Sequence, residues 1–245
     1  MKRFTLILLT VLMAAACRKV SPDQRIAQIN KYFDKTDNTY VEDLQRFDNE
    51  KRMDYLTLTI AKELNAADIF TIEHADAQSL VAQFPGREKK QMRYSILSAS
   101  LDDPEACAVA LSTLKALKDL KLKPNGTIHA LFYSNAVDTA GVSGLDAVFQ
   151  DIRDSEEQIT FELELTTRDS LARHTFVIED KEFFADQLIE VVPPYMAKLG
   201  TFQFRKGRYP NREWPIKAPV YRYSTDPTDL RKEAAAITLF SLLLN

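Results

Sequence analysis

Several oxygen-bearing side chains follow one apolar segment of the chain and are its first candidates for chemistry. Ser100, Asp102, Asp103 and Glu105 stand at the end of a predicted strand, residues 93–100. Clustered carboxylate oxygens can hold Ca²⁺ or Mg²⁺. The same residues flank Pro104 and precede a predicted helix, whose first turn acidic groups stabilise. We favour the helix cap, and a weak oxygen-ligand cation site is the alternative.

The residue types that carry most enzyme chemistry are few in this chain. Its histidines are His74, beside a peripheral predicted strand, His129, inside a predicted strand, and His174, at the start of one, so none lies where a central strand ends. Cys107 lies among alanines in a predicted helix, which favours a small core residue over a nucleophile. The sequence has no Gly-x-Ser-x-Gly elbow, P-loop, dinucleotide fingerprint or Cys-x-x-Cys pair. Serine hydrolysis, nucleotide binding and dithiol chemistry are therefore unsupported.

The elements that position these residues alternate between the helical and the strand period. The predicted strands are residues 69–73, 79–84, 93–100, 127–134, 159–167, 174–178 and 219–224, and the predicted helices are residues 29–33, 41–64, 104–121, 181–199 and 229–244. The order of strand, helix and strand implies right-handed crossovers between parallel strands. We therefore predict an α/β fold, a three-layer α/β/α sandwich with a mixed, mostly parallel sheet. Its site should lie at the carboxyl ends of the strands.

Composition narrows the class of protein. The 245 residues are 45% hydrophobic and 27% charged, which suits one globular domain, predicted at residues 28–245. The 32 basic residues are scattered among 35 acidic ones and the net charge is −3. A basic stripe is the electrostatic signature of a nucleic-acid binder. We therefore predict no nucleic-acid partner.

The pattern of the N-terminal residues indicates an export signal with a lipid anchor. Lys2 and Arg3 precede an apolar stretch, residues 4–13, which is too short to span a bilayer, and three alanines then precede Cys17. Residues 1–16 resemble the signal peptide of a bacterial lipoprotein, which implies lipidation of Cys17, a tether at residues 17–27 and a membrane partner. An ordinary secretory signal is the alternative. Without an acidic run after Cys17 we expect the periplasmic face of a membrane, and Cys107 alone can form no intramolecular disulfide.

Three runs of sequence match a known family in order and spacing. They are residues 80–86, with the pattern Val-Ala-x-x-Pro-Gly, residues 96–103, and residues 108–133, in which Leu-Lys-Pro-x-x-Thr-Ile follows a helix. These runs resemble the exported two-zinc aminopeptidases, whose relatives include glutaminyl cyclases and the peptidase-like domain of the transferrin receptor. The resemblance extends from about residue 44 to the C-terminus. It implies the zinc-aminopeptidase-like form of the sandwich.

The resemblance also implies where a metal site would lie. Active members hold two zinc ions with a His-x-Asp after the first central strand, a bridging Asp, a Glu-Glu pair, a later Asp and a last His. The first Glu of the pair serves as the base. On this chain Ser100 stands at the first histidine, Asp102 keeps the carboxylate, and Asp103 could stand for the bridging aspartate. Asp103 follows Asp102 directly, so the loop that separates the two in the family is absent.

The later ligand positions depart further from the family pattern. Ala136 and Val137 stand where the Glu-Glu pair is expected. Glu164, or Glu162, lies near the late aspartate, but the two share one face of an alternating strand and we favour a solvent-facing pair. Residues 221–226 contain no histidine for the last ligand. The predicted remnant of the metal site is Asp102, Asp103 and Glu164, with no zinc bound, and zinc held by relocated ligands is the alternative.

One late segment has the composition of an interface. Residues 202–215 combine four basic and four aromatic residues, including the single tryptophan of the chain. Arginine and aromatic side chains are enriched in protein interfaces. The candidates for contact with a partner are Arg208, Tyr209, Arg212 and Trp214. The equal alternative is a long connection whose aromatic rings pack on the sheet.

Together these expectations favour a binding protein over an enzyme. We predict a membrane-anchored bacterial lipoprotein whose degenerate, non-catalytic aminopeptidase-like domain acts as a binding or assembly module for a protein or peptide in the cell envelope. An active zinc-dependent aminopeptidase or related hydrolase with relocated ligands is the alternative.

Overall fold

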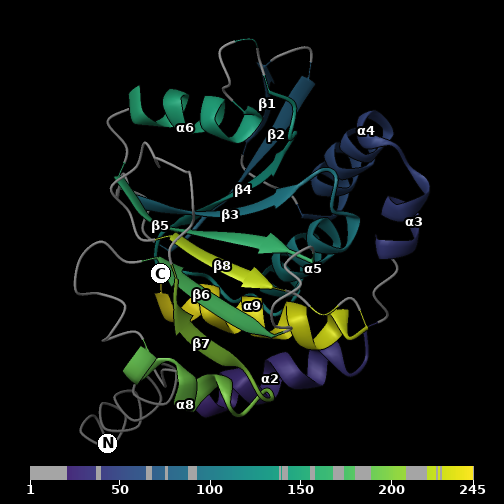
Figure 1. Cartoon of the computed structure of the whole chain (residues 1–245). Helices are drawn as coiled ribbons and strands as arrows, with labels where there is room; N and C mark the ends of the chain where they lie inside the picture. The colour runs from purple at the N-terminus through teal and green to yellow at the C-terminus, as the bar shows by residue number, and fades with distance from the viewer. Residues whose placement is uncertain are drawn as a thin grey trace, which may run out of the picture.

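A computed structural model of the chain is shown in Figure 1. It describes residues 21–36, 40–64, 68–74, 77–87, 93–137, 139, 143–154, 158–167, 174–179, 189–207, 220–224, 226 and 228–244. The helices are α2 (Pro22–Phe33), α3 (Tyr40–Arg46), α4 (Asn49–Thr59), α5 (Pro104–Asp119), α6 (Gly144–Asp154), α8 (Pro193–Met196) and α9 (Leu230–Leu244), with a π-helical turn at Ile60–Leu64 after α4. The strands are β1 (Ile69–His74), β2 (Ala77–Phe84), β3 (Arg93–Ser100), β4 (Thr127–Tyr133), β5 (Gln158–Thr166), β6 (Thr175–Glu179), β7 (Gln203–Lys206) and β8 (Val220–Ser224).

The described strands form one mixed sheet in the order β1-β2-β4-β3-β5-β8-β6-β7. Its four central strands, β4, β3, β5 and β8, are parallel to one another. Strands β2, β6 and β7 run in the opposite direction. The predicted α/β fold with a mixed, mostly parallel sheet is therefore confirmed.

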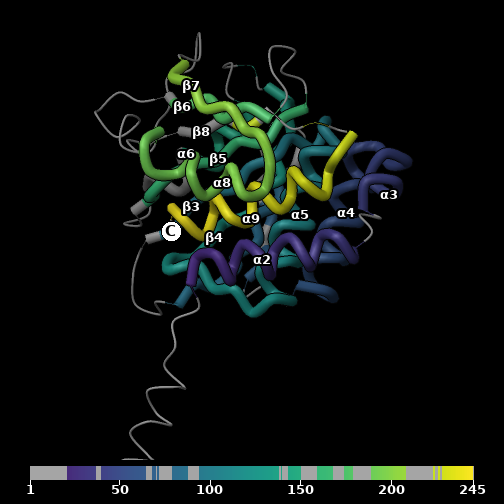
Figure 2. Tube along the Cα trace, turned by 90° about the horizontal axis from the view of Figure 1, so that it is seen from below, coloured from purple at the N-terminus to yellow at the C-terminus, as the bar shows by residue number. Residues whose placement is uncertain are grey.

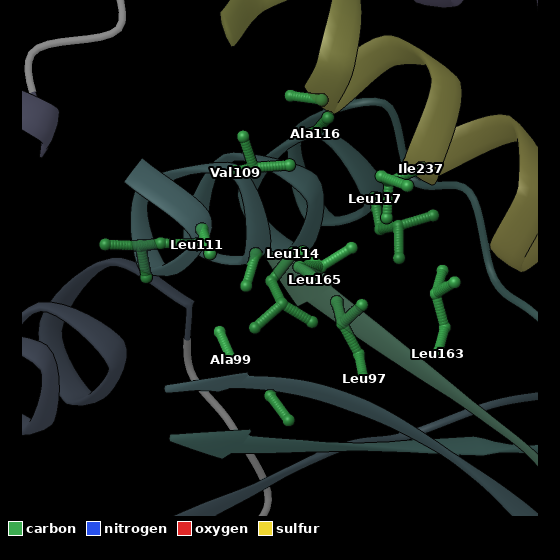
Figure 3. Packing of buried hydrophobic residues seen from close by; sticks show 14 of the residues in the cluster. Leu97, Ala99, Val109, Leu111, Leu114, Ala116, Leu117, Leu163, Leu165 and Ile237 are labelled. Carbon is green, nitrogen blue, oxygen red and sulfur yellow. The ribbon is translucent and has the colours of Figure 1, made fainter. Parts of the chain in front are cut away.

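Helices cover both faces of this sheet. On one face α5 packs against β3 and β5, and α9 packs against α5. Figure 3 shows Leu97 of β3 and Leu163 of β5 beneath Leu114 and Leu117 of α5, with Ile237 of α9 beside them. On the other face α6 places a smaller apolar cluster over the sheet. That cluster contains Val81, Tyr94, Ile96, Leu131, Tyr133, Leu145, Val148 and Phe149. The result is the predicted three-layer sandwich.

Two of the observed elements were absent from the sequence prediction. Helix α6 begins with a capping box, in which Ser143 Oγ accepts from Asp146 N at 3.2 Å and Asp146 Oδ2 accepts from Ser143 N at 3.2 Å. The available signals were the spacing Ser-x-x-Asp at residues 143–146 and the apolar stripe of Leu145, Val148 and Phe149. Strand β7 is a short edge strand with mostly exposed side chains, so it carries little hydrophobic pattern.

The helical part of the chain begins earlier than the predicted tether allowed. Ser21 caps α2, because its Oγ accepts from Gln24 N at 3.2 Å and Gln24 Oε1 accepts from Ser21 N at 3.1 Å. Ile26, Ile29 and Phe33 are buried on one side of α2, which lies alongside α9 in Figure 2. Residues 22–27 are therefore helix, and Cys17 and the signal segment lie outside the described residues. No helix in the described part of the chain has the length and apolarity needed to cross a bilayer.

Candidate functional site

The candidate site lies along the edge of the sheet where the parallel central strands end. Ser100 closes β3, Ser134 and Asn135 follow β4, Thr167 follows β5, and Asp226 comes shortly after β8. In Figure 1 the arrowheads of β3 and β8 point toward this edge. Parallel α/β sheets carry their binding sites at such an edge.

Asp102 is held by two amide side chains. Asn49 Nδ2 donates to Asp102 Oδ1 at 2.6 Å, and Asn135 Nδ2 donates to Asp102 Oδ2 at 2.8 Å. Asn135 Nδ2 also donates to Ser100 Oγ at 2.6 Å. An ionised carboxylate only accepts hydrogen bonds, so the amide nitrogens must be the atoms that face it. Both oxygens of Asp102 are thus engaged with N–H donors of the protein.

Asp103, unlike Asp102, is held by the first turn of a helix and by a neighbouring strand end. It is the N-cap of α5, where its Oδ1 accepts from Ala106 N at 3.0 Å. Its two oxygens also accept from Thr167, at 2.7 Å from the backbone N and at 2.8 Å from Oγ1. The predicted cap is confirmed, and Asp103 in addition ties the end of β3 to the end of β5. Glu105 takes no part in this cluster and accepts instead from Gln45 Nε2 at 2.7 Å.

A buried arginine beneath this edge was missed by the sequence reasoning. Arg52 is 8% exposed and donates to three backbone carbonyls: Leu44 at 2.8 Å, Phe47 at 2.6 Å, and Leu101. It also donates to Asn49 Oδ1 at 2.9 Å, which turns the Asn49 nitrogen toward Asp102. Arg52 therefore fixes the amide that occupies one oxygen of Asp102. Its position in a helix with both charged and apolar neighbours gave no signal of burial.

The positions predicted for the glutamate pair offer only backbone groups. Ala136 N donates to Ser134 Oγ at 3.1 Å, and Ala136 O accepts from Gly144 N at 3.2 Å. The Val137 side chain is 59% exposed at the rim. Neither side chain can bind a metal or accept a proton from water.

Glu162 and Glu164 lie in the sheet and not on a solvent face. They are 0% and 4% exposed, so the predicted solvent-facing pair is wrong. Ser98 Oγ donates to Glu162 Oε1 at 2.8 Å, and Tyr133 OH donates to Glu164 Oε1 at 2.9 Å. The alternation correctly put both residues on one face, but β5 is a central strand and that face is covered. Polar partners on β3 and β4 offset the cost of burying the two carboxylates.

His174 reaches the carboxyl edge although it precedes a strand. Because β6 runs antiparallel to β8, the start of β6 lies beside the end of β8, with Thr175 opposite Ser224. His174 Nδ1 lies 2.5 Å from Glu233 Oε1, and its Nε2 lies 3.6 Å from Asp226 Oδ2. The sequence reasoning excluded His174 because it starts a predicted strand and does not end one. We call His174, Asp226 and Glu233 the histidine clasp.

The histidine clasp places one imidazole against two carboxylates. At 2.5 Å the Nδ1 and Oε1 atoms must share a hydrogen, whereas Nε2 lies 3.6 Å from Asp226 Oδ2, beyond hydrogen-bond distance. His174 also has a positive φ of 57°, which is uncommon outside glycine. Burial raises the pKa of Glu233 to about 7. The clasp joins β6, the segment after β8 and α9 most firmly when it is protonated.

We expect this proton to make stability depend on pH. The pKa of Glu233 rises from 4.5 to about 7 on folding, so its contribution is complete below pH 4.5 and is lost as the pH rises through 7. The loss is at most about 3.5 kcal/mol, since each pKa unit is worth about 1.4 kcal/mol. Urea unfolding at pH 5 and pH 8 measures it, with Glu233→Gln as the comparison. An equal fall in both proteins would contradict the assignment.

The other sequence candidates have structural roles or lie outside the described residues. His129 stacks on Tyr94 with ring centroids 4.1 Å apart, and burial lowers its pKa to about 4, so it is neutral at pH 7. Cys107 is fully buried, burial raises its thiol pKa, and its Sγ lies 3.2 Å from Ser100 O, as expected of a core residue. The His74 side chain and the segment with Arg208, Tyr209, Arg212 and Trp214 are not described. Among the described residues no group of three or more His, Cys, Asp or Glu side chains is arranged to hold a metal ion.

The sequence has no match among family models or among curated proteins. The structure, in contrast, resembles solved structures. LapA aminopeptidase of Legionella pneumophila has a TM-score of 0.60 at 12% identity, over 94% of this chain and 74% of LapA. A leucine aminopeptidase precursor of Bacteroides thetaiotaomicron has a TM-score of 0.53 at 9% identity, over 93% of this chain and 98% of that one.

The structure of a glutaminyl cyclase also resembles that of this chain. The glutaminyl cyclase of Bacteroides thetaiotaomicron, solved with N-acetylhistamine, has a TM-score of 0.53 at 10% identity, over 93% of this chain and 98% of the cyclase. At sequence identities this low, the similarity shows a shared fold and does not show a shared chemistry. The chain has the fold shared by zinc aminopeptidases and glutaminyl cyclases.

Proposed function

We propose that this protein is a bacterial lipoprotein, anchored through Cys17 at the periplasmic face of a membrane, and that its aminopeptidase-like domain is a non-catalytic module that binds a protein or peptide. The observation that carries the non-catalytic part is the amide pair on Asp102. Asn49 and Asn135 direct N–H groups at the two oxygens that a metal would need.

The hydrogen bonds at this edge oppose metal binding. A cation at Asp102 would have to displace donors whose bonds to a charged group contribute about 1.5–3 kcal/mol each. Asp103 is committed to the first turn of α5 and to Thr167. Ser100 supplies a neutral hydroxyl that already accepts from Asn135. Two zinc ions do not fit these residues, and no catalytic step is assigned to them.

The same edge suits recognition of a peptide. Asn135 is exposed, Asp102 is half-buried and Val137 is exposed, so polar groups and an apolar side chain lie together at the rim. We assign Arg208, Tyr209, Arg212 and Trp214 to the same partner as interface residues, from their composition. The fold that the chain shares with peptidases supports the alternative of an active zinc hydrolase.

Enzyme assays on the purified mature protein separate these two functions. Aminoacyl and N-terminal glutaminyl peptides are incubated with the protein in the presence of added zinc, with the Asp102→Asn variant as a matched control. We expect no turnover above that of the variant. Turnover that depends on zinc and is lost in Asp102→Asn would overturn the non-catalytic assignment. Mass spectrometry of the N-terminal peptide, with Cys17→Ser as control, tests the anchor separately.

A further inference from the structure

The rigid part of the protein begins very close to the proposed lipid anchor. The capping box at Ser21 fixes the first turn of α2, and three residues lie between Cys17 and Ser21. A fully extended chain spans at most about 3.6 Å per residue step, so four steps place Ser21 within about 14 Å of the lipidated cysteine. Whatever surface surrounds the start of α2 is therefore held near the bilayer.

The segment around α8 forms part of that surface. Lys198 pairs with Asp23 in the first turn of α2. Val192 and Met196, four residues apart, are 3% and 0% exposed and attach the segment to the core. Of the side chains between them, Pro194 is exposed at the surface, while Tyr195 is half-buried against the core.

The outward face of this segment carries apolar side chains beside the charged Glu190 and Lys198. Val191 is 59% exposed and Pro194 is exposed. Residues 191, 194 and 198 are spaced by three and four, which places them on the side opposite the buried Val192 and Met196. Among the described residues the exposed large hydrophobic side chains are Leu58, Val137 and Val191. Of these, Val191 lies on the segment that Lys198 pins to the start of α2.

From this geometry we infer that the outward face of residues 189–198, together with the start of α2, rests on the phospholipid bilayer. The inference depends on the proposed lipid anchor and adds a fixed membrane-facing surface to it. One exposed valine and one proline bind a bilayer weakly by themselves, because apolar contact scales with buried area. A short tether makes the second contact intramolecular and raises its effective concentration to the millimolar range.

Fluorescence quenching on vesicles tests this surface with a matched control. The full mature chain, with its native lipid, carries Val191→Cys or Leu58→Cys labelled with an environment-sensitive dye. Leu58 on α4 is 57% exposed, so the two sites differ in position and hardly in exposure. Cys107 is fully buried with a raised thiol pKa and does not take up the dye. The vesicles contain phosphatidylethanolamine, phosphatidylglycerol and a spin-labelled lipid as the quencher.

We expect at least about threefold stronger quenching at position 191 than at position 58, as for a residue at the headgroup boundary. The Cys17→Ser variant added to the same vesicles should show quenching at neither position. Equal quenching at both positions, or none at 191 in protein whose mass includes the lipid, would overturn the membrane-facing surface and leave the anchor intact. A mass that lacks the lipid would instead overturn the anchor, and the surface with it.

Discussion

Replacement of Asp103 by alanine is expected to lower the free energy of unfolding by about 2–4 kcal/mol, without any change in zinc affinity. An N-cap contributes about 1 kcal/mol, and bonds from buried donors to a charged acceptor contribute about 1.5–3 kcal/mol. Asp103 has both roles, because it caps α5 and accepts twice from Thr167 at the end of β5. Urea unfolding followed by circular dichroism measures the loss.

Two variants show whether the cap alone or the strand tie carries this effect. Asp48 is the exposed N-cap of α4, and its side chain accepts from Lys51 N at 3.0 Å. Asp48→Ala removes this cap and an exposed pair with Lys51, and should therefore cost less than Asp103→Ala. Thr167→Val keeps the cap of Asp103 and removes the hydroxyl donor, so its cost should be about 1–2 kcal/mol. An Asp103→Ala protein as stable as the parent would refute the structural role of this carboxylate.

Replacement of Arg52 by leucine is expected to lower the free energy of unfolding by about 3–5 kcal/mol. Removing one member of a buried charged network leaves its partners unsatisfied, and each buried acceptor without a donor costs about 1–3 kcal/mol. Arg52 serves the carbonyls of Leu44, Phe47 and Leu101, so three acceptors lose their donor at once. Asn49 also loses the contact that orients its amide toward Asp102.

The matched control for Arg52 is another arginine of the same region. Arg46 at the end of α3 pairs with Glu42 and Asp43 on the surface, with a side chain that is 69% exposed. Arg46→Leu should change stability by less than about 1 kcal/mol, because exposed ion pairs contribute little. Equal losses in the two variants would show that Arg52 stabilises the fold through charge alone and not through its buried hydrogen bonds.

The predictable part of the fold was the part in which local pattern and burial agree. Strand β3 has the predicted bounds because its apolar run fits a central strand, and α5 begins where Asp103 and Pro104 predicted a helix start. Two elements were missed for different reasons. Strand β7 is short and mostly exposed, so it carries little hydrophobic pattern. Helix α6 has both a capping box and an apolar stripe of Leu145, Val148 and Phe149 at helical spacing, which the prediction overlooked.

The candidate site was harder to predict because it depends on which strands become neighbours. Glu162 and Glu164 alternate like a solvent face, and only the position of β5 between β3 and β8 buries them. His174 precedes its strand in sequence, yet an antiparallel β6 brings it to the carboxyl edge. Strand direction is a property of the whole sheet, and a single sequence holds little local record of it.

The histidine clasp forms a second polar cluster at the carboxyl edge of the sheet. Asp226 follows β8, near the position where the resemblance implied a last histidine ligand, and its side chain faces His174 and Thr228. Thr228 Oγ1 lies 2.7 Å from Asp226 Oδ1. The polar groups of the edge are therefore divided between one cluster around Asp102 and another around His174.

Zinc titration by isothermal calorimetry tests the central claim most directly, because the claim is that Asp102 and its neighbours are occupied by protein donors and not by metal. The metal-free mature domain is titrated with zinc at pH 7, alongside the Asp102→Asn variant. We predict no binding with a Kd below about 10 μM in either protein. Binding of one or two zinc ions at submicromolar Kd, lost in Asp102→Asn, would contradict the account.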